Sequence, residues 1–528
     1  MKFKYFIQLA LILFAFNNYA QVNKAHNPLI YADVPDASII RVENTYYMSS
    51  TTMHMSPGVP IMKSNDLVNW TLVNYAYDRL DEVDAMNLEN GKSTYGRGSW
   101  ASCLRYHKGV FYVSTFAATT GKTYIYSTKN IEKGPWKKIS FEPAYHDHSI
   151  LFEEDKAYMV WGAGKISIAE LKQDLSGIKE ETKRVLIENA TAPAGDRIML
   201  PAEGSQLFKI RGKYYLFNIS WPRGGMRTVI IHKADKLSGS WEGRVALQDK
   251  GVAQGGLIST PEGKWFSYLF KDNGGVGRIP YLVPVIWVND WPVLGENGKV
   301  PETLDLPKSK GLIPGIVNSD NFKRKKNDRD LPLVWQWNHN PDNSLWSVRD
   351  REGFLRLKTG RIDTLLFQAK NTLTQRTIGP ESKATTFLDV SKMKDGDISG
   401  LCLLQKQYGF IAVKKENGVK RIIMISAASG KEKELGSIPL KQNQVYFKAE
   451  CDFKNQKDTG RFYYSLDGEK WKSLGDPIKL PYTLPHFMGY RFGLFNYATK
   501  QIGGFVDFDY LEVEVPHNHL MIMLIITI

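Results

Sequence analysis

The stretch Leu200-Pro-Ala-Glu-Gly-Ser-Gln-Leu-Phe-Lys-Ile-Arg-Gly-Lys-Tyr-Tyr-Leu-Phe217 contains a unit that recurs along the chain. An acidic residue, Glu203, lies two positions before Ser205. A short apolar run then leads to a turn at Arg211 and Gly212, and an aromatic run follows. Short apolar and aromatic runs on both sides of a glycine turn predict a β-hairpin.

The same frame occurs at four other places, where it opens at Ser38, Ser102, Ser149 and Gly256. In every copy an aromatic residue stands nine positions after the opening residue, and successive openings are between 47 and 64 residues apart. Strands that repeat on this scale without helices are the signature of a β-propeller with one sheet per blade. The sequence therefore predicts five blades.

The position two residues before each opening holds mostly polar side chains that could act on a ligand. It holds, in chain order, Asp36, Trp100, Asp147, Glu203 and Gln254. Equivalent positions of successive blades point at one shared axis, so we expect these five side chains to ring a central pocket. One acid beside a hairpin is usually a turn cap or solvated. Three acids in one register instead indicate a functional site.

The first twenty residues are expected to lie outside the fold. Lys2 and Lys4 precede an apolar run over residues 5–16, and Tyr19-Ala20-Gln21 offers a small-residue cleavage point. This pattern predicts a secretory signal peptide, too short for a membrane span, and cleavage near Ala20. The mature chain is then expected in the periplasm or outside the cell.

The rest of the chain divides into two expected domains. We assign residues 21–312 to the propeller, with 284–292 as the piece that closes its circle. Residues 353–358, 400–404 and 505–510 read as strands without the acidic frame, so 313–516 are predicted to form a β-sandwich. The fold class is all-β. Residues 517–528 form an apolar tail that is too short to span a bilayer and receives no assignment.

Cysteine usage and charge exclude several function classes. The three cysteines, Cys103, Cys402 and Cys451, are scattered and odd in number, which is a poor disulfide framework. The sequence has no CxxC motif, and its histidines are not spaced as metal ligands usually are, so it predicts no metal site. The formal net charge of +14 is spread along the chain, and its tightest basic run, residues 323–326, lies in a turn-like stretch. We expect neither nucleic-acid binding nor a membrane partner.

Several motifs together resemble glycoside hydrolase family 43. The propeller region contributes Tyr31-Ala-Asp-Val-Pro-Asp36, Trp100, Asp147-His-Ser-Ile-Leu-Phe152, Ala202-Glu-Gly204 and Gly277-Arg-Ile-Pro280. Trp335-Gln-Trp-Asn-His-Asn-Pro341 and Asp507-Phe-Asp-Tyr510 resemble the C-terminal β-sandwich of the β-xylosidase and α-L-arabinofuranosidase branch. The resemblance covers nearly the whole mature chain and implies a five-bladed β-propeller followed by a β-sandwich.

The resemblance also implies a role for each acid. Asp36 would be the general base that activates a water, and Glu203 the general acid that protonates the departing oxygen. Asp147 would orient Glu203 and keep its pKa high, because nearby negative charge disfavours ionisation. Arg278 resembles the family's pocket arginine. The expected substrate contacts are Trp100, Gln254, Arg278, Met53 and Trp221.

Two positions depart from the family pattern. Many members carry a histidine that faces a central ion where this chain has Ala253, so a calcium ion on the propeller axis is disfavoured and no cofactor is required. Xylosidase-like members carry aromatics before the motif that here is Pro57-Gly-Val-Pro60, whereas this chain has Met53-His-Met-Ser56. The identity of the pentose stays open.

The expected function is that of an inverting, exo-acting glycoside hydrolase. It would remove terminal α-L-arabinofuranosyl or β-D-xylosyl residues from plant hemicellulose or its oligosaccharides, which would be its partners. A sandwich that caps the propeller favours a pocket and hence exo action. Two alternatives are a non-catalytic carbohydrate-binding propeller and a propeller scaffold for protein partners. The oligomeric state is open.

Overall fold

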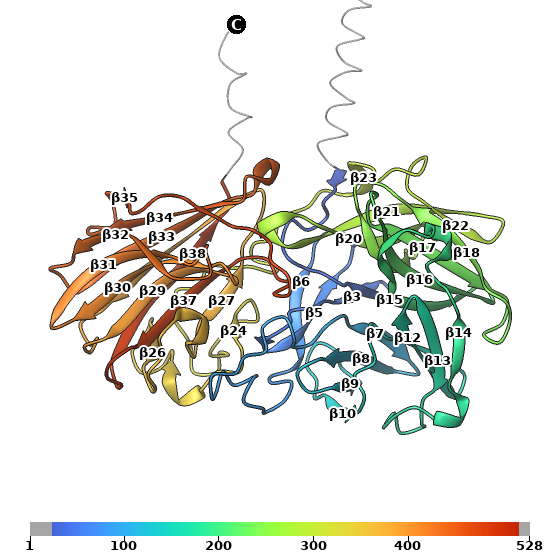
Figure 1. Ribbon diagram of the computed structural model, residues 1–528, viewed down its shortest axis with the longest axis horizontal. Coiled ribbons are helices and arrows are strands. Elements are labelled where there is room, and N and C mark those ends of the chain that lie inside the picture. Colours follow the sequence, from blue (N-terminus) through green and yellow to red (C-terminus); the bar gives the residue numbers. More distant parts are fainter. Residues whose placement is uncertain (1–23, 517–528) are drawn as a thin grey trace, which may run out of the picture.

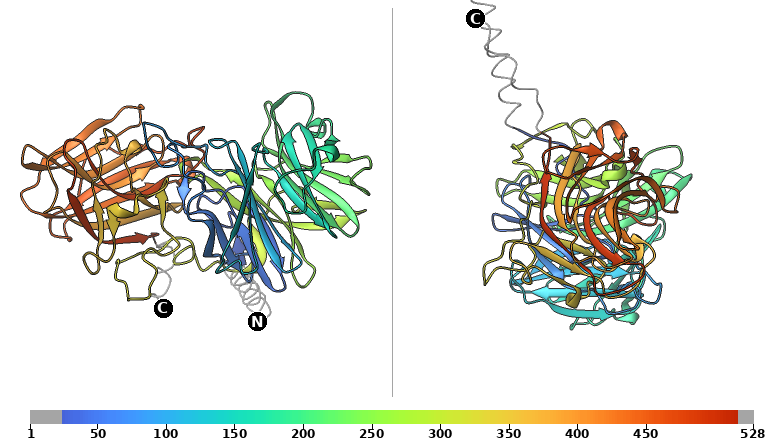
Figure 2. Two further views of the ribbon diagram at one scale, coloured as in Figure 1. Left: turned by 90° about the horizontal axis from the view of Figure 1, so that it is seen from below. Right: turned by 90° about the vertical axis from the view of Figure 1, so that its left-hand side faces the viewer.

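The computed structural model describes residues 24–516. The expected signal peptide and the apolar tail both lie outside these residues. The described part is built from strands and short 3-10 helices, with no α-helix. Its strands form two lobes side by side, one from blue to green and one from yellow to red (Figures 1 and 2). In the described part, no helix is long and apolar enough to cross a membrane.

The first lobe is a five-bladed β-propeller whose blades are four-stranded antiparallel sheets. Blade one contains β2 (Ser38–Val42), β3 (Thr45–Ser49), β5 (Gly58–Ser64) and β6 (Thr71–Tyr77). Blade two contains β7 (Cys103–His107), β8 (Val110–Ala117), β9 (Lys122–Thr128) and β10 (Lys137–Phe141). Blade three contains β11 (Ser149–Glu153), β12 (Lys156–Ala163), β13 (Lys165–Glu170) and β14 (Arg184–Ile187). Each hairpin predicted from the repeats forms the first two strands of a blade.

Blades four and five complete the ring. Blade four contains β15 (Ile198–Ile210), β16 (Lys213–Pro222), β17 (Thr228–Ala234) and β18 (Glu242–Leu247). Blade five contains β19 (Ala253–Ser259), β20 (Trp265–Asp272), β21 (Arg278–Val288) and β22 (Trp291–Leu294). The first strand of each blade contacts that of the next, and β19 contacts β2. The predicted five-bladed propeller is confirmed.

The ring is closed by the ends of the propeller segment. Strand β1 (Lys24–His26) pairs antiparallel with β23 (Thr303–Pro307). The Arg41 guanidinium Nε of blade one also donates to the Ser259 carbonyl of blade five at 2.8 Å. Residues 284–292, by contrast, belong to β21 and β22, the outer strands of blade five. The prediction that they close the circle was wrong, because their aromatic residues pack against blade four: Trp291 is buried in a cluster with Phe217, and the Trp287 ring lies 5.3 Å from that of Tyr215.

The second lobe is a β-sandwich, as predicted. One sheet has the order β32-β31-β30-β29-β37-β27-β24-β4. Its strands are β32 (Lys433–Pro439), β31 (Val419–Ser426), β30 (Gly409–Glu416), β29 (Asp397–Leu404), β37 (Arg491–Ala498), β27 (Leu373–Arg376), β24 (Gln336–Asn338) and β4 (Met55–Ser56). The other has the order β25-β26-β38-β28-β33-β34-β35, with β36 (Ile478–Lys479) beside β34. Its strands are β25 (Trp346–Ser347), β26 (Leu355–Lys358), β38 (Phe505–Glu514), β28 (Glu381–Asp389), β33 (Gln444–Asp452), β34 (Thr459–Ser465) and β35 (Lys472–Ser473).

The two lobes share a sheet. Strand β4 belongs to the propeller segment of the sequence, yet it pairs with β24 of the sandwich through Met55 and Asn338. The buried Gln336 amide donates to Thr52 Oγ1 at 3.1 Å and to the Pro57 carbonyl at 2.7 Å. The buried amide nitrogen of Gln336 thus has two acceptors, both from the propeller segment. The junction is therefore built as part of the core.

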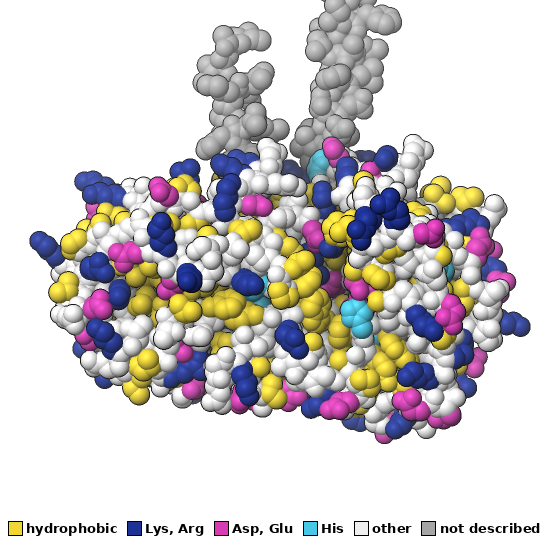
Figure 3. Space-filling model, viewed as in Figure 1, with side chains coloured by type: hydrophobic (Ala, Val, Ile, Leu, Met, Phe, Trp, Pro, Cys, Tyr) yellow, Lys and Arg dark blue, Asp and Glu magenta, His cyan; other side chains and the backbone are white. Residues whose placement is uncertain are grey.

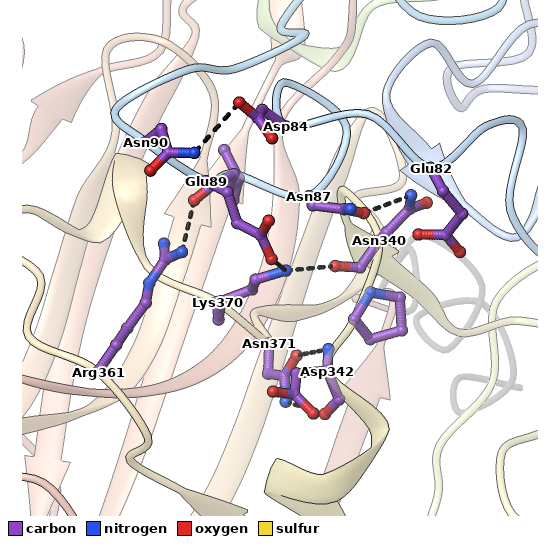
Figure 4. Close-up of polar contacts among 12 residues, drawn as sticks. Glu82, Asp84, Asn87, Glu89, Asn90, Asn340, Asp342, Arg361, Lys370 and Asn371 are labelled. Carbon is purple, nitrogen blue, oxygen red and sulfur yellow. Dashed lines mark hydrogen bonds and ion pairs between the residues drawn. The ribbon is translucent and has the colours of Figure 1, made fainter.

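Polar contacts hold a long propeller loop, residues 78–98, against the sandwich (Figure 4). The Asn340 side-chain amide donates to Asn87 Oδ1 at 2.9 Å, and Lys370 Nζ lies 4.0 Å from the Glu89 carboxylate. Arg361 donates to the carbonyl of Leu88. This loop follows β6, so it fixes the sandwich at the edge of blade one.

Over the visible face of the protein, charges of both signs are interspersed (Figure 3).

Candidate active site

The predicted register places its acids through a repeated backbone feature. Asp36, Asp147 and Gln254 have positive φ angles of 54°, 45° and 57°, and Gly204, directly after Glu203, has φ 66°. Non-glycine residues rarely adopt this left-handed conformation, which costs of order 1–3 kcal/mol where the surrounding structure enforces it. In four blades a left-handed residue therefore lies at the register position or directly after it, beside or within the innermost strand.

Asp36 forms a buried ion pair with Arg278. The Asp36 side chain is 3% exposed, and its Oδ1 accepts hydrogen bonds from Arg278 Nη1 and from Gln254 Nε2, each at 3.1 Å. Burial lowers the pKa of the Arg278 guanidinium, but the charge of Asp36, together with those of Tyr482, Asp33 and Asp272, outweighs this effect, and the pKa is raised. Asp36 Oδ2 is buried and has no hydrogen-bond partner in the described part of the chain. One carboxylate oxygen is thus fixed and the other is free.

Asp147 is buried beside the other two acids. Its Oδ2 accepts the backbone N–H of Gly204 at 3.0 Å, which links blade three to blade four. Burial raises the pKa of Asp147, the cationic His146 opposes this, and the charges of Glu203 and Asp36 add to the rise, to about 7. A carboxyl held in this way is partly protonated near neutral pH.

Glu203 is bound by a residue that the sequence analysis did not single out. His146 Nε2 lies 2.9 Å from Glu203 Oε2 and 3.6 Å from Asp147 Oδ2. Burial alone would lower the pKa of the His146 imidazole, but the hydrogen bond to Glu203 and the charges of Asp147 and Glu203 raise it to about 9. Its position directly before Asp147 was the available signal. Only the turn at Asp147 shows that both side chains face one centre.

Gln254 connects the acids across blades. Besides its bond to Asp36, its side chain lies against Gly204: a Cβ added there would come within 2.8 Å of Gln254 Cγ and Cδ. Glycine is therefore required at 204 both by the backbone angle and by this close approach. Asp36, Gln254, Gly204, Asp147, His146 and Glu203 form one continuous chain of contacts.

One wall of the site comes from the sandwich. Arg278 Nη2 donates to the carbonyl of Phe487 at 3.2 Å, and the Phe487 ring meets the half-buried Trp100 edge-on, with centroids 4.8 Å apart. Phe487 itself has φ 56°. Sequence reasoning missed this residue, because it lies more than two hundred positions beyond the propeller repeats and carries no part of their frame.

Two predicted substrate contacts have other neighbours. Met53 is 1% exposed and packs in a cluster with sandwich residues such as Phe410 and Phe495. Trp221 is half-buried; its Nε1 donates to the Gly225 carbonyl at 3.1 Å, and the Arg227 guanidinium lies over its ring. Direct contacts thus unite Asp36, Asp147, Glu203, Gln254 and Arg278, with Trp100 at the wall.

In residues 24–516, one cluster of side chains has ligand atoms close enough together to hold a metal ion, and hydrogen bonds already engage its members. Ligand atoms of His146, Asp147 and Glu203 lie within 4.8 Å of one another. Nε2 of His146 already bonds Glu203, and Asp147 bonds the Gly204 amide, so we assign no ion to them. Ala253, at the start of β19, is fully buried, and its methyl group cannot bind an ion at the position where many family members carry a histidine. The fit for an axial ion is therefore poor at this position.

Comparison with known proteins places this geometry in a family. Residues 25–292 match Glycosyl hydrolases family 43, and residues 319–514 match the Beta xylosidase C-terminal Concanavalin A-like domain. A putative beta-xylosidase of Xylanibacter ruminicola is 31% identical over 84% of this chain and 82% of its own length. A non-reducing end alpha-L-arabinofuranosidase of Bacteroides ovatus is 26% identical over 76% of this chain and 77% of its own length.

A solved structure supports the same assignment. The structure described as "Bifunctional GH43-CE" of Bacteroides eggerthii superposes with a TM-score of 0.92 at 66% sequence identity. The match covers 93% of this chain and 64% of that chain. Two family matches in the expected order, a relative above 30% identity and this superposition all point to one family. The chain belongs to glycoside hydrolase family 43 and carries that family's catalytic propeller followed by its concanavalin A-like sandwich.

Proposed function

We propose that this protein is an inverting, exo-acting glycosidase that removes terminal pentoses from hemicellulose-derived oligosaccharides. The observation that carries the proposal is the chain of contacts that joins Asp36, Asp147 and Glu203, from three blades, through Gln254, Gly204 and His146. Inversion needs a deprotonated carboxylate on one side of the sugar and a protonated acid on the other, roughly 6.5–9.5 Å apart to admit a water.

Asp36 suits the role of general base. Arg278 and Gln254 both bind Oδ1 and keep the carboxylate oriented, while Oδ2 has no partner in the described residues. A water hydrogen-bonded to Oδ2 would lose its proton there as its oxygen attacks the anomeric carbon.

Glu203 suits the role of general acid. Its carboxyl is 21% exposed, the most accessible of the three, so it can reach a glycosidic oxygen. Asp147 accepts the Gly204 amide and so fixes the backbone directly after Glu203. The two acids thereby divide positioning and proton transfer between them.

The sandwich loop favours exo action. Phe487 contacts Arg278 and Trp100 beside the acids, and a sandwich residue in this place would restrict a chain that continues past the terminal sugar. The names of the relatives, a putative β-xylosidase and a non-reducing end α-L-arabinofuranosidase, support a terminal pentose. They leave arabinofuranose and xylose as the two candidates. We also propose that the chain is secreted after removal of its N-terminal segment.

The test is a panel of para-nitrophenyl α-L-arabinofuranoside, para-nitrophenyl β-D-xyloside, linear arabinan and xylo-oligosaccharides. We expect monomer release, with the product anomer inverted in proton NMR. Glu203→Gln and Asp36→Asn should lose at least about 100-fold in kcat on the oligosaccharides, whereas Glu242→Gln, on an outer strand, should keep full activity. Internal cleavage without monomer would refute exo action. Sugar binding with no hydrolysis would favour the binding-protein alternative.

A further inference from the structure

His146 is placed to act on the proton of Glu203. In residues 24–516, the Glu203 carboxylate has one side-chain hydrogen-bond partner, the imidazole Nε2 of His146 at 2.9 Å. A carboxylate oxygen can only accept, so Nε2 must carry the hydrogen whenever Glu203 is ionised. Such a bond between an imidazolium and a carboxylate is charge-assisted and stronger than a neutral one.

The ring also reaches solvent. The His146 side chain is 47% exposed, against 21% for Glu203 and 7% for Asp147. On its inner side it meets the edge of Phe116, with ring centroids 5.6 Å apart. His146 therefore stands between the buried acids and the water outside, and it is the most exposed titratable member of the site.

The groups that face His146 favour a proton on this pair. Glu203 and Asp147 lie at 2.9 and 3.6 Å and are negative when ionised, while His148, from the same segment, is buried with its pKa lowered to about 4 and is therefore neutral near pH 7. The pKa of His146 is raised to about 9. Over the neutral range the His146 imidazole thus holds a proton, and this proton lies in its hydrogen bond to Glu203.

We propose that, within the glycosidase activity proposed above, His146 positions Glu203 and supplies it from solvent with the proton that Glu203 gives to the leaving group. The Nε2 proton moves to Oε2, which leaves a neutral imidazole and a carboxylic acid. Glu203 then protonates the glycosidic oxygen as its bond to the anomeric carbon breaks. The attacking water forms the new bond and gives its proton to Asp36. Afterwards Asp36 releases that proton to solvent, and His146 takes one up.

Two variants of His146 remove the proton in its hydrogen bond to Glu203 in different ways. His146→Phe removes both the hydrogen bond and the titrating group, whereas His146→Gln keeps an N–H donor that does not titrate. The matched control is His107→Gln, because His107 is a partly exposed histidine at the far end of β7. Each variant is assayed on a para-nitrophenyl pentoside that the wild type hydrolyses and on the corresponding unactivated disaccharide.

We expect both His146 variants to lose about 10- to 100-fold in kcat on the disaccharide, which needs a proton on its leaving oxygen, and less than about 3-fold on the nitrophenyl substrate, which does not. The basic limb of the kcat/KM profile should move to lower pH by about one unit or more. Imidazole added to His146→Gly should restore part of the disaccharide activity. A basic limb that stays in place or moves to higher pH would overturn the proposal. So would a rise in KM with unchanged kcat, which would make His146 a substrate contact.

A second measurement does not depend on activity. Nitrogen-15 NMR of labelled histidine should show the His146 ring still protonated at about pH 8, and Glu203→Gln should lower its pKa by more than about one unit. A wild-type His146 that titrates at its ordinary value would refute the shared proton even in an active enzyme. A wild type that cleaves no pentoside but shows the raised titration would instead refute the proposed function.

Discussion

The backbone N–H of Gly204 donates to Asp147 Oδ2 at 3.0 Å, so the residue after one acid is bound by the acid of the neighbouring blade. The same glycine contacts the Gln254 side chain, which in turn binds Asp36. Position 204 thereby sets the spacing of all three acids. The site depends on this backbone position as much as on its carboxyl groups.

Gly204→Ala should damage the site more than the fold. A Cβ would meet Gln254 at 2.8 Å while the backbone stays at φ 66°, which displaces Gln254 or Gly204. We expect a loss of at least about 100-fold in kcat/KM, since small misplacements of catalytic groups have effects of that size. The unfolding free energy should fall by about 1–2 kcal/mol from the left-handed backbone alone.

Gly212→Ala is the matched control for this change. Gly212 has φ 80° in the β15–β16 turn, and a Cβ there would meet no atom within 4 Å. Gly212→Ala should therefore lower the unfolding free energy by a similar amount, measured by urea denaturation, and leave kcat/KM intact. Equal losses of activity in both variants would show that the Gln254 contact is unimportant.

Arg278→Met should destabilise the protein strongly. It leaves the Asp36 carboxylate buried without its charge partner, and breaking a buried pair in this way costs about 3–5 kcal/mol. Adding Asp36→Asn to Arg278→Met should recover much of that loss, because no charge then remains unpaired. Activity should be lost in both variants, since the general base is either mispositioned or absent.

Arg227→Met provides the comparison. Arg227 pairs with Asp272 at 2.7 Å, but the two side chains are 20% and 33% exposed. An ion pair that water screens contributes up to about 1 kcal/mol, so the melting temperature should change little. If Arg278→Met were as mild as Arg227→Met, the buried pair would not be a source of stability.

The repeat frame was sufficient to predict the propeller and the three acids. Asp36, Asp147 and Glu203 share a register relative to Ser38, Ser149 and Ser205, and a closed ring converts equal register into spatial proximity. Gln254 followed from the same frame. Arg278 came from the resemblance alone, because it lies on the third strand of its blade rather than at the repeated position.

The remaining features of the site and of the domain junction depend on long-range contacts that no local sequence pattern encodes. Phe487 reaches Arg278 from the sandwich, and β4 leaves its own blade region to pair with β24. His146 faces the acids only because the backbone turns at Asp147. Met53 was placed in the site by comparison with a family motif, but the docking of the sandwich buries it in a hydrophobic cluster. Such long-range contacts depend on how the two domains pack.

Asp147→Asn should make the protein more stable above neutral pH. Because the folded state raises the pKa of Asp147 to about 7, the native protein binds more protons than the unfolded chain between its ordinary value of 3.8 and about 7. Its contribution to stability therefore falls as pH rises through that window. The asparagine keeps an oxygen for the Gly204 amide without the buried charge.

The measurement is the difference in melting temperature between Asp147→Asn and the wild type as a function of pH. The difference should be positive at about pH 8 and vanish below about pH 4, where the wild-type carboxyl is protonated in both states. Asp290→Asn, at an exposed turn, should show no such trend. A difference independent of pH would mean that the gain does not come from the buried charge.

Three buried histidines at the domain junction should make the protein sensitive to acid. His54 lies with its ring centroid 5.0 Å from those of both His339 and His486. Burial, followed by the charges of neighbouring cationic groups, lowers the pKa of all three, that of His486 to about 3. Unfolded histidine binds protons below about 6.5, so the unfolded chain takes up more protons than the native state across that interval.

The unfolding free energy should accordingly fall as pH drops from about 6.5 towards 3. His486→Phe removes one of the three groups and keeps an aromatic ring beside Tyr95, which stacks on His486 at 5.5 Å. We expect this variant to show a shallower loss of stability in acid, measured by urea denaturation at several pH values, and His26→Phe, near the propeller's strand β1, to follow the wild type. Identical acid profiles for His486→Phe and the wild type would show that the junction histidines do not control acid stability.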